Sequence, residues 1–370
     1  MLLTSLEVSH VRNLQNLKLI PHPSMNFVVG PNGSGKTSLL EAIYLLASGR
    51  SFRTPLARKI VSHQQTALMV FGEIRDGKGI PHKAGIRKGL EGDTLVKIDG
   101  ERRERMSDLA TLLPAICLDA ASFDLVDGGP SERRQLLDWG LFHVEHEFLE
   151  AWKSYQIALK QKSSLLRSGK ESLIRKQLAH WNEQQALWGE RIHSSRTAYV
   201  EWLVAALQRT IGTYVGSMPL EVEYKPGWNR SIHSALQDCL AANMDGEIEK
   251  QACQHGPHKG DLVIRWGDTL ARDVCSRGQK KLVIYAVRLA QVMTLFERRQ
   301  LAPLLLLDDL PAELDTHNLQ SVARFLRDYP CQTFITAIHE QALTDALLAL
   351  FQDHHMFHVE HGQLIQTTSA

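Results

Sequence analysis

The sequence contains no run of apolar residues long enough to cross a lipid bilayer. The first residues also lack the pattern of a secretory signal, in which a basic stretch precedes an apolar core and a small-residue cleavage site. We therefore expect a cytoplasmic protein that has no membrane partner.

Cysteine is also scarce, since the 370 residues include only five, and none of them forms a Cys-x-x-Cys pair. This spacing argues against a zinc module and against a disulfide framework. An excess of charge is missing as well, because 42 basic residues stand against 41 acidic ones. The overall charge therefore gives no sign of a nucleic-acid partner.

Basic residues do gather locally, but a short cluster taken singly is more often a solvated face than a track for phosphates. The clusters are Arg50, Arg53, Arg58 and Lys59; Arg102, Arg103 and Arg105; and Lys160, Lys162, Arg167, Lys170, Arg175 and Lys176.

One short segment carries the strongest signal in the chain. Residues 30–37 fit the pattern Gly-x4-Gly-Lys-Ser/Thr, which forms the phosphate-binding loop of ATP- and GTP-hydrolysing proteins. An apolar run at 25–29 predicts a strand before the loop, and 38–46 has helical spacing after it. Backbone N–H groups and the helix N-terminus would hold phosphate. The predicted nucleotide-binding residues are Gly30, Pro31, Asn32, Gly33, Ser34, Gly35, Lys36, which would reach the β- and γ-phosphates, and Thr37, which would hold Mg²⁺.

The remaining pattern indicates an α/β fold with a helical insertion. Strands are expected at 2–8, 17–20, 25–29, 67–74 and 95–98, with hairpin turns at Asp76-Gly77 and Asp99-Gly100. Residues 145–214 have helical spacing and predict a hairpin whose second arm is about 40 residues long. Alternating strands and helices return at 262–336. We expect an ATP-binding head at 1–125 and 256–370, containing a mixed sheet, and an inserted helical lobe at 126–255.

Two acidic residues follow the apolar run at 304–307. Asp308 suits the Mg²⁺ carboxylate that accompanies a phosphate loop, and Asp309 could position or deprotonate the attacking water. Two acids after a strand could also be a helix cap, but together with the phosphate loop they favour a catalytic site.

A second anion-binding segment lies about 30 residues earlier, where Ser276 and the Gly278 N–H open a helix. An ordinary helix cap would explain it. Because a second phosphate site within one subunit could not serve the same nucleotide, the segment instead favours a head-to-tail dimer. Each ATP would lie between the phosphate loop of one chain and residues 276–279 of the other.

These motifs resemble the RecF family of ABC-type ATPases, which are related to SMC heads. The similarity covers nearly the whole chain. The matching segments are Val11–Leu14, Val29–Ser38, Gly49–Arg53, Gly129–Asp138, His255–Asp261, the signature loop Cys275–Gln279 and the Walker B and D-loop segment Asp308–Asp315.

The resemblance implies an ATP- and Mg²⁺-dependent protein of DNA replication, recombination and repair. Such a protein acts in the response to DNA damage, including the SOS response. Double-stranded, gapped and single-stranded DNA are implied partners, together with RecO, RecR and, indirectly, RecA. ATP-dependent homodimerisation and slow, DNA-stimulated hydrolysis are implied as well. The resemblance also adds Arg12, Asn13 and Ser38 to the ATP-binding residues of one chain. The contacts that it implies from the other chain are Ser276, Arg277, Gly278, Gln279 and Asp315.

The sequence leaves the roles of some residues open. The residue that contacts the γ-phosphate could be Thr336 or His339. Residues 120–123 lack the Pro-Glu or Pro-Asp pair that members of the family often carry. Asp309 stands where many related ATPases have glutamate, which predicts a slow switch rather than a motor. The alternatives are a scaffold with negligible hydrolysis, the ATPase subunit of a transporter and, less favoured, a metabolic kinase. The repeated sequence Phe-His-Val-Glu-His at 142–146 and 357–361 is interpreted as a coincidence rather than a metal site.

Overall fold

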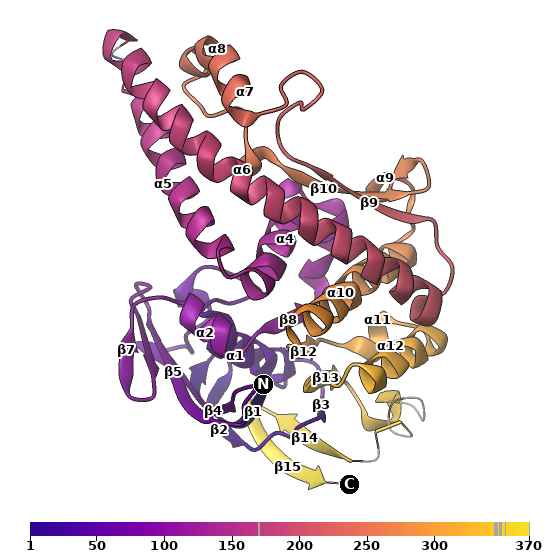
Figure 1. Ribbon diagram of the computed structural model, residues 1–370. Helices are drawn as coiled ribbons and strands as arrows, with labels where there is room; N and C mark the ends of the chain where they lie inside the picture. Colours follow the sequence, from indigo (N-terminus) through magenta and orange to yellow (C-terminus); the bar gives the residue numbers. More distant parts are fainter. Residues whose placement is uncertain (169–170, 344–346, 348–349, 352, 370) are drawn as a thin grey trace. The chain divides into compact units, whose positions relative to one another are not determined.

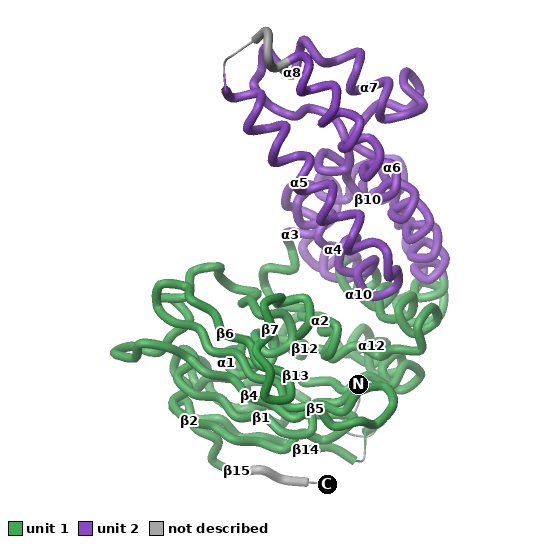
Figure 2. The backbone as a smooth tube through the Cα atoms, turned by 60° about the vertical axis from the view of Figure 1, so that its left-hand side comes forward, with its two compact units in different colours: residues 1–123, 209–216, 284–370 green, residues 124–208, 217–283 purple. Residues whose placement is uncertain are grey.

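The computed structural model describes residues 1–168, 171–343, 347, 350–351 and 353–369 (Figure 1). Gly169, in the expected turn of the helical hairpin, and Lys170 of the third basic cluster lie outside these ranges. The chain divides into two units, residues 1–123, 209–216 and 284–370 forming unit 1 and residues 124–208 and 217–283 forming unit 2 (Figure 2).

Unit 1 contains an antiparallel sheet whose strands lie in the order β2-β1-β4-β5-β6-β7. The turns at Asp76-Gly77 and Asp99-Gly100 connect neighbouring strands of this sheet, as predicted. The strands are β1 (Leu2–Val11), β2 (Leu14–Leu19), β4 (Ala67–Arg75), β5 (Pro81–Gly89), β6 (Thr94–Ile98) and β7 (Glu101–Arg103).

A second sheet of unit 1 has the order β15-β14-β3-β13-β12-β8 and is parallel except for β15. Three of its strands are mostly apolar and are buried along their whole length, as expected for a parallel sheet. The mixed sheet that the sequence predicts is therefore present. Its strands are β3 (Met25–Val29), β8 (Ala115–Leu118), β12 (Leu304–Leu307), β13 (Thr333–Ala337), β14 (His354–Glu360) and β15 (Gln363–Ser369).

Helix α1 (Lys36–Ser48) is the centre of the unit 1 core. Its apolar side chains belong to one buried cluster with side chains from strands of both sheets. Burial of this helix fixes its N-terminus directly after β3 and the phosphate loop. The other helical elements are η1 (Ala57–Lys59), α2 (Ser107–Leu112), η2 (Ala120–Phe123), η3 (Ile211–Val215), α11 (Leu310–Glu313), α12 (Thr316–Asp328) and η5 (Glu340–Leu343).

Unit 2 contains the predicted helical hairpin, formed by α5 (Phe148–Leu166) and α6 (Glu171–Thr210), and α6 has the predicted length of 40 residues. Helix α6 ends in unit 1, and α10 (Arg277–Arg299) begins in unit 2 and continues into unit 1. The shorter helices are α3 (Asp124–Asp127), α4 (Pro130–Val144), α7 (Leu236–Ala242), α8 (Met244–Glu249), η4 (Pro257–Lys259) and α9 (Ala271–Val274).

Unit 2 is larger than the expected inserted lobe at 126–255, because residues 256–283 belong to it and 209–216 do not. The reason is a three-stranded sheet in the order β11-β10-β9, formed by β9 (Leu220–Lys225), β10 (Asp261–Trp266) and β11 (Thr269–Leu270). Antiparallel pairing of β10 with β9 joins residues 261–266 to the helical unit. Residues 262–266 form a strand, as expected, but this strand lies in the small sheet of unit 2 and not in the mixed sheet of the head.

Candidate nucleotide site

The phosphate loop connects β3 to α1 and has a backbone that only glycine adopts easily. Gly33 and Gly35 have φ of +79° and +122°, and a Cβ on Gly35 would lie 2.9 Å from Leu14 Cδ2. Both constraints explain why the glycines occupy these positions. The loop closes directly onto the first turn of α1, where unpaired N–H groups and the helix dipole favour an anion.

Lys36 begins α1 and folds back over the loop. Its Nζ donates to the carbonyl oxygens of Gly30 and Pro31, at 2.7 and 3.0 Å. Burial lowers the pKa of the Lys36 ammonium, and the charges of Asp309 and Asp308 oppose that shift. The cation is thus held above the loop by neutral acceptors, where the charged oxygens of a phosphate would be stronger acceptors.

Asp308 joins three segments that are far apart in the sequence. Its carboxylate accepts hydrogen bonds from the hydroxyls of Thr37, at 2.9 Å, and Thr336, at 2.7 Å. Thr37 lies in the first turn of α1, Asp308 follows β12, and Thr336 lies in β13. A hydroxyl and a carboxylate side by side are suitable Mg²⁺ ligands, since Mg²⁺ is usually bound by one or two carboxylates together with substrate phosphates.

Asp309 follows with a left-handed backbone, at φ 51°. Its N–H donates to Thr336 Oγ1 at 2.6 Å, so one hydroxyl is shared between the two acids. Burial and, next, the charge of Asp308 raise the pKa of the Asp309 carboxyl. Thr336 is thus bonded within the site, whereas His339 is exposed two residues beyond the end of β13.

The turn between β1 and β2 packs against the same loop. Asn13 Nδ2 donates to the carbonyl of Gly33 at 3.0 Å, and Asn13 Oδ1 accepts from the Ser38 hydroxyl at 2.9 Å. Arg12 makes a bidentate pair with Glu41, at 2.8 and 2.9 Å. The structure therefore places these three predicted residues around the phosphate loop, while Pro31 and Asn32 are exposed on it.

Sequence reasoning missed Glu41, which is fully buried on α1. Its carboxylate binds Arg12, accepts from the Ser51 hydroxyl and lies 3.8 Å from the Arg53 guanidinium. Ser51 in turn accepts from the backbone of Arg53. The sequence signal for Glu41 was a glutamate within an apolar helical stretch, with Ser-Phe-Arg ten residues later.

Residues 276–279 begin helix α10, in unit 2. Ser276 Oγ accepts from the Gln279 N–H at 3.3 Å, and Gln279 Oε1 accepts from the Ser276 N–H at 2.8 Å. This reciprocal arrangement is a capping box. Ser276, Arg277 and Gly278 are exposed, and a Cβ on Gly278 would meet nothing within 4 Å. Asp315 is exposed as well and caps α12 by accepting from the Asn318 N–H at 2.9 Å.

The segments 129–138 and 255–261 meet inside unit 2. Arg133, from the first segment, pairs with Asp261 of the second at 2.7 Å, and Arg134 donates to the carbonyl of Gly260 at 2.9 Å. Arg196 on α6 bonds both segments, through Asp138 and the carbonyl of Pro257. The charged residues of 129–138 and 255–261 therefore tie the helical hairpin to the small sheet.

The two Phe-His-Val-Glu-His sequences have different structures. The first spans the end of α4, where burial lowers the pKa of His143 to about 3, and the second lies at the end of β14. Among the described residues, no group of three or more His, Cys, Asp or Glu side chains is arranged to hold a metal ion. None of the helices there is long and apolar enough to span a membrane.

Comparisons with known proteins agree on one family. The model of the RecF/RecN/SMC N terminal domain matches residues 2–362. The DNA replication and repair protein RecF of Pseudomonas paraeruginosa is 38% identical over 374 residues, covering 100% of this chain and 99% of that protein. The structure described as the recombination mediator protein RecF-ATP in the RecFOR pathway has 24% identity and a TM-score of 0.85, covering 100% of this chain and 97% of the other. An SMC head bound to the C-winged helix domain of ScpA has 14% identity and a TM-score of 0.59, covering 100% and 98%.

Proposed function

Because the chain belongs to the RecF/RecN/SMC N-terminal domain family, and within it to the RecF proteins, we propose that it is an ATP-dependent DNA-binding protein of recombinational repair and replication restart. The observation that carries this proposal is the position of Asp308, bonded to both Thr37 and Thr336 beside the phosphate loop. This is the arrangement that a Mg²⁺–nucleotide complex needs.

The chain's own residues would divide the work as follows. The loop N–H groups and Lys36 would bind the phosphates, and Thr37 and Asp308 would hold Mg²⁺, which would supply positive charge beside the phosphate oxygens. Asp309 orients the attacking water and accepts its proton. Asn13, which supports the carbonyl of Gly33, keeps the loop in shape around the nucleotide. The site supports Thr336 over His339 as the residue nearest the reacting phosphate, because Thr336 already bonds both acids.

The exposed start of α10 supports a composite site formed by two chains. Ser276 and Gly278 of one chain would close over the γ-phosphate held by Lys36 of the other, with Arg277, Gln279 and Asp315 as further contacts. A capping box keeps this helix start ordered while leaving it accessible. ATP binding would thereby drive dimerisation, and hydrolysis would remove the bridging phosphate and release the dimer.

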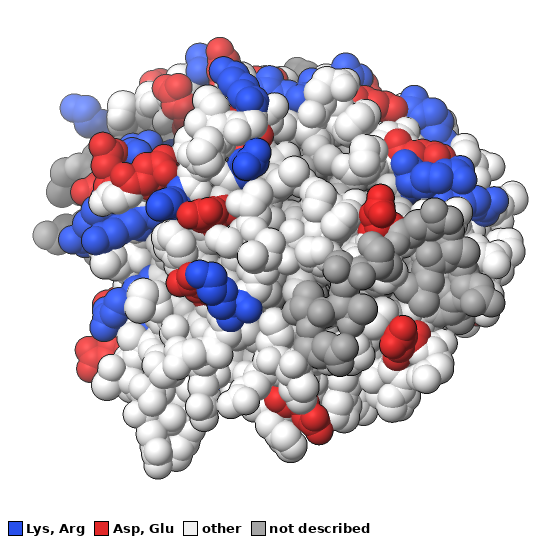
Figure 3. Space-filling model, turned by 90° about the horizontal axis from the view of Figure 1, so that it is seen from below, with Lys and Arg blue, Asp and Glu red and all other residues white. Residues whose placement is uncertain are grey.

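Dimerisation would also create the DNA-binding surface. On the face seen in Figure 3, basic and acidic side chains are interspersed around a broad uncharged area, so the residues drawn there form no continuous basic track. Pairing two chains can combine clusters that are weak singly. We propose that gapped or junction DNA is bound mainly through phosphates, in the cytoplasm, and that the dimer assists RecA loading together with RecO and RecR.

The proposed function can be tested by measuring binding to gapped and uniform duplexes with ATP, with ADP and without nucleotide, at two salt concentrations. We expect ATP-dependent binding that weakens steeply with salt. Equal binding in all three nucleotide conditions would contradict the proposal. Tight ATP binding without phosphate release in the presence of DNA would instead favour a scaffold.

Replacing Asp308 should remove the benefit of magnesium. The Asp308→Asn variant loses the negative charge beside Thr37, so we expect ATP affinity to become insensitive to Mg²⁺, whereas Mg²⁺ should tighten binding by the unaltered chain. Titration of ATP with and without Mg²⁺ measures this. The control is Asp93→Asn, on an exposed carboxylate paired with Arg87. A variant that still responds to Mg²⁺ like the unaltered chain would remove Asp308 from the metal site.

Asp309 should set both the rate of hydrolysis and its pH dependence. Its short side chain predicts turnover below about 10 per second without DNA. Because the pKa of Asp309 is raised, we expect the rate to fall as pH decreases through that pKa, when the base becomes protonated. Asp309→Asn should abolish turnover, and Asp309→Glu should increase it. Steady-state phosphate release between pH 5 and 9 checks this, and a profile that is identical in the Asp309→Asn variant would contradict it.

A further inference from the structure

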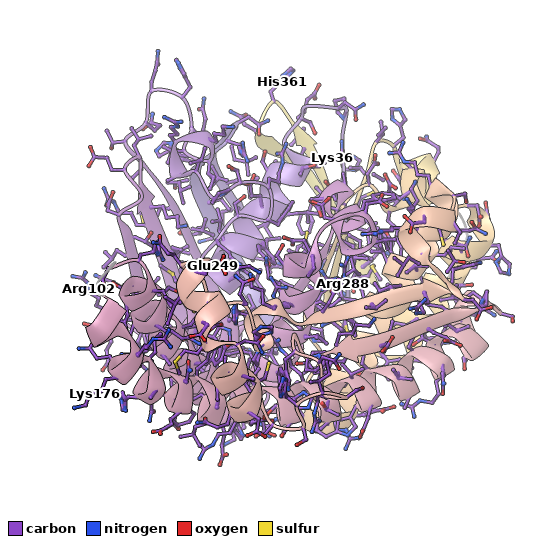
Figure 4. All side chains as sticks on the ribbon, turned by 90° about the horizontal axis from the view of Figure 1, so that it is seen from above. Lys36, Arg102, Lys176, Glu249, Arg288 and His361 are labelled. Atoms are coloured by element: carbon purple, nitrogen blue, oxygen red, sulfur yellow. The ribbon has the colours of Figure 1, made fainter. Side chains whose placement is uncertain are left out.

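The last strands of the chain form a hairpin whose turn reaches the phosphate loop. Glu360 of β14 pairs with Gln363 of β15, which leaves His361 and Gly362 as a two-residue turn. Both have positive φ, at 49° and 75°, which is the type I′ geometry. In Figure 4 the His361 side chain projects from the tip of this hairpin, and it is 92% exposed.

Strand pairing fixes where this turn lies. Strand β14 runs parallel to β3, and His358 is opposite Val29, the residue directly before the loop. The next residues remain in contact, since a Cβ on Gly30 would overlap the carbonyl oxygen of Val359. Phe357 and Val359 are buried in the unit 1 core together with side chains of α1, so the core anchors this strand of the hairpin.

One hydrogen bond joins the turn to the loop itself. The Gly362 N–H donates to the carbonyl oxygen of Ser34 at 2.8 Å. In a planar trans peptide the C=O and N–H groups point in opposite directions. Because the carbonyl of Ser34 is held toward the Gly362 N–H, the N–H of Gly35 points the other way, away from the hairpin.

The neighbouring carbonyl is held in the same manner by Asn13 Nδ2, which bonds Gly33. The two supports also touch, because a Cβ on Gly362 would overlap the carbonyl oxygen of Asn13. Two turns from opposite ends of the sequence thus hold two successive carbonyls of one loop. Only a glycine at 362 leaves room for this packing.

We propose that the turn His361-Gly362 is a positioning element of the nucleotide site, with the Gly362 N–H fixing the Ser34–Gly35 peptide in the orientation that binds phosphate. This inference rests on the proposed ATP binding. By reciprocity, a bound nucleotide stabilises the hairpin to the same extent that the hairpin stabilises the nucleotide complex. The stability of the hairpin therefore depends on whether nucleotide is bound.

The chain offers a matched control for this proposal. Asp99-Gly100 forms another two-residue turn, between β6 and β7, with φ of 52° and 84°, and a Cβ on Gly100 meets nothing within 4 Å. Gly362→Ala and Gly100→Ala therefore bear the same backbone strain. Only Gly362→Ala also disturbs the phosphate loop.

The test is calorimetric titration of each full-length variant with a non-hydrolysable ATP analogue and Mg²⁺, alongside thermal unfolding. We expect the Kd of Gly362→Ala to rise about tenfold or more, as loss of an ordered loop hydrogen bond with added crowding requires. Gly100→Ala should bind the analogue like the unaltered chain, although its backbone strain also lowers the unfolding temperature. Equal affinity in all three proteins overturns this inference alone, whereas no binding by the unaltered chain overturns the proposed function as well.

Hydrogen exchange in the unaltered chain decides the matter if Gly362→Ala fails to fold. The same ATP analogue should slow amide exchange in 357–365 and leave 96–103 unchanged. Equal exchange at 357–365 with and without the analogue would overturn the proposal.

Discussion

Lys36→Ala should lose nearly all of its affinity for ATP. The ammonium now bonds two loop carbonyls, and it would transfer to the β- and γ-phosphates when nucleotide enters. Each charge-assisted hydrogen bond contributes about 1.5–3 kcal/mol, so losing two should weaken binding by about a hundredfold or more. Calorimetric titration with Mg²⁺–ATP measures the loss directly.

The control for this variant is Lys18→Ala, which removes an exposed lysine paired with Glu7 in the same unit. It should bind ATP like the unaltered chain. Thermal unfolding of Lys36→Ala without nucleotide should show a folded protein of somewhat lower stability, because the carbonyls of Gly30 and Pro31 lose their donor. Normal ATP affinity in Lys36→Ala would contradict the assignment of the phosphate loop.

Ser276→Arg should bind ATP normally but fail to dimerise. The residue is exposed at the start of α10, where a long cation would occupy the space meant for the partner's nucleotide. Sedimentation velocity with and without ATP separates this defect from that of Lys36→Ala. We expect the unaltered chain to shift from monomer to dimer on adding ATP, and the variant to stay monomeric.

The same replacement elsewhere in unit 2 provides the comparison. Ser231→Arg alters another exposed serine and should leave ATP-induced dimerisation intact. Ser276→Ala separates the loss of the helix cap, worth about 1 kcal/mol, from the obstruction caused by arginine. ATP-dependent dimers of Ser276→Arg would show that this helix start lies outside the interface.

Local patterns were sufficient to predict the parts of the site that follow directly from the chain. The run at 25–29, the glycine loop and the helix after it are adjacent in sequence, and the structure has them as predicted. The long helix α6 was also predictable, because apolar and aromatic residues from Ile174 to Trp202 follow helical spacing along most of its length. Asp308 was predicted from a strand ending in acids, although its bond to Thr336 needed the strand order.

The features that were missed depend on contacts between distant segments. Strand β14 pairs with β3 across more than 300 residues, and its sequence is rich in histidine rather than β-branched residues. The bounds of unit 2 depend on β9 pairing with β10, which no local pattern shows. Glu41 looks like an ordinary helical glutamate until Arg12 and Ser51 are brought beside it.

In the proposed dimer, each ATP lies between the phosphate loop of one chain and the start of α10 of another. Mixing Lys36→Ala with Ser276→Arg tests it most directly, because a mixed dimer has one intact composite site although neither variant can form one alone. Sedimentation velocity of the mixture with Mg²⁺–ATP should show a dimer that is absent from either variant by itself. A mixture that remains monomeric, under conditions in which the unaltered chain dimerises, would contradict the account.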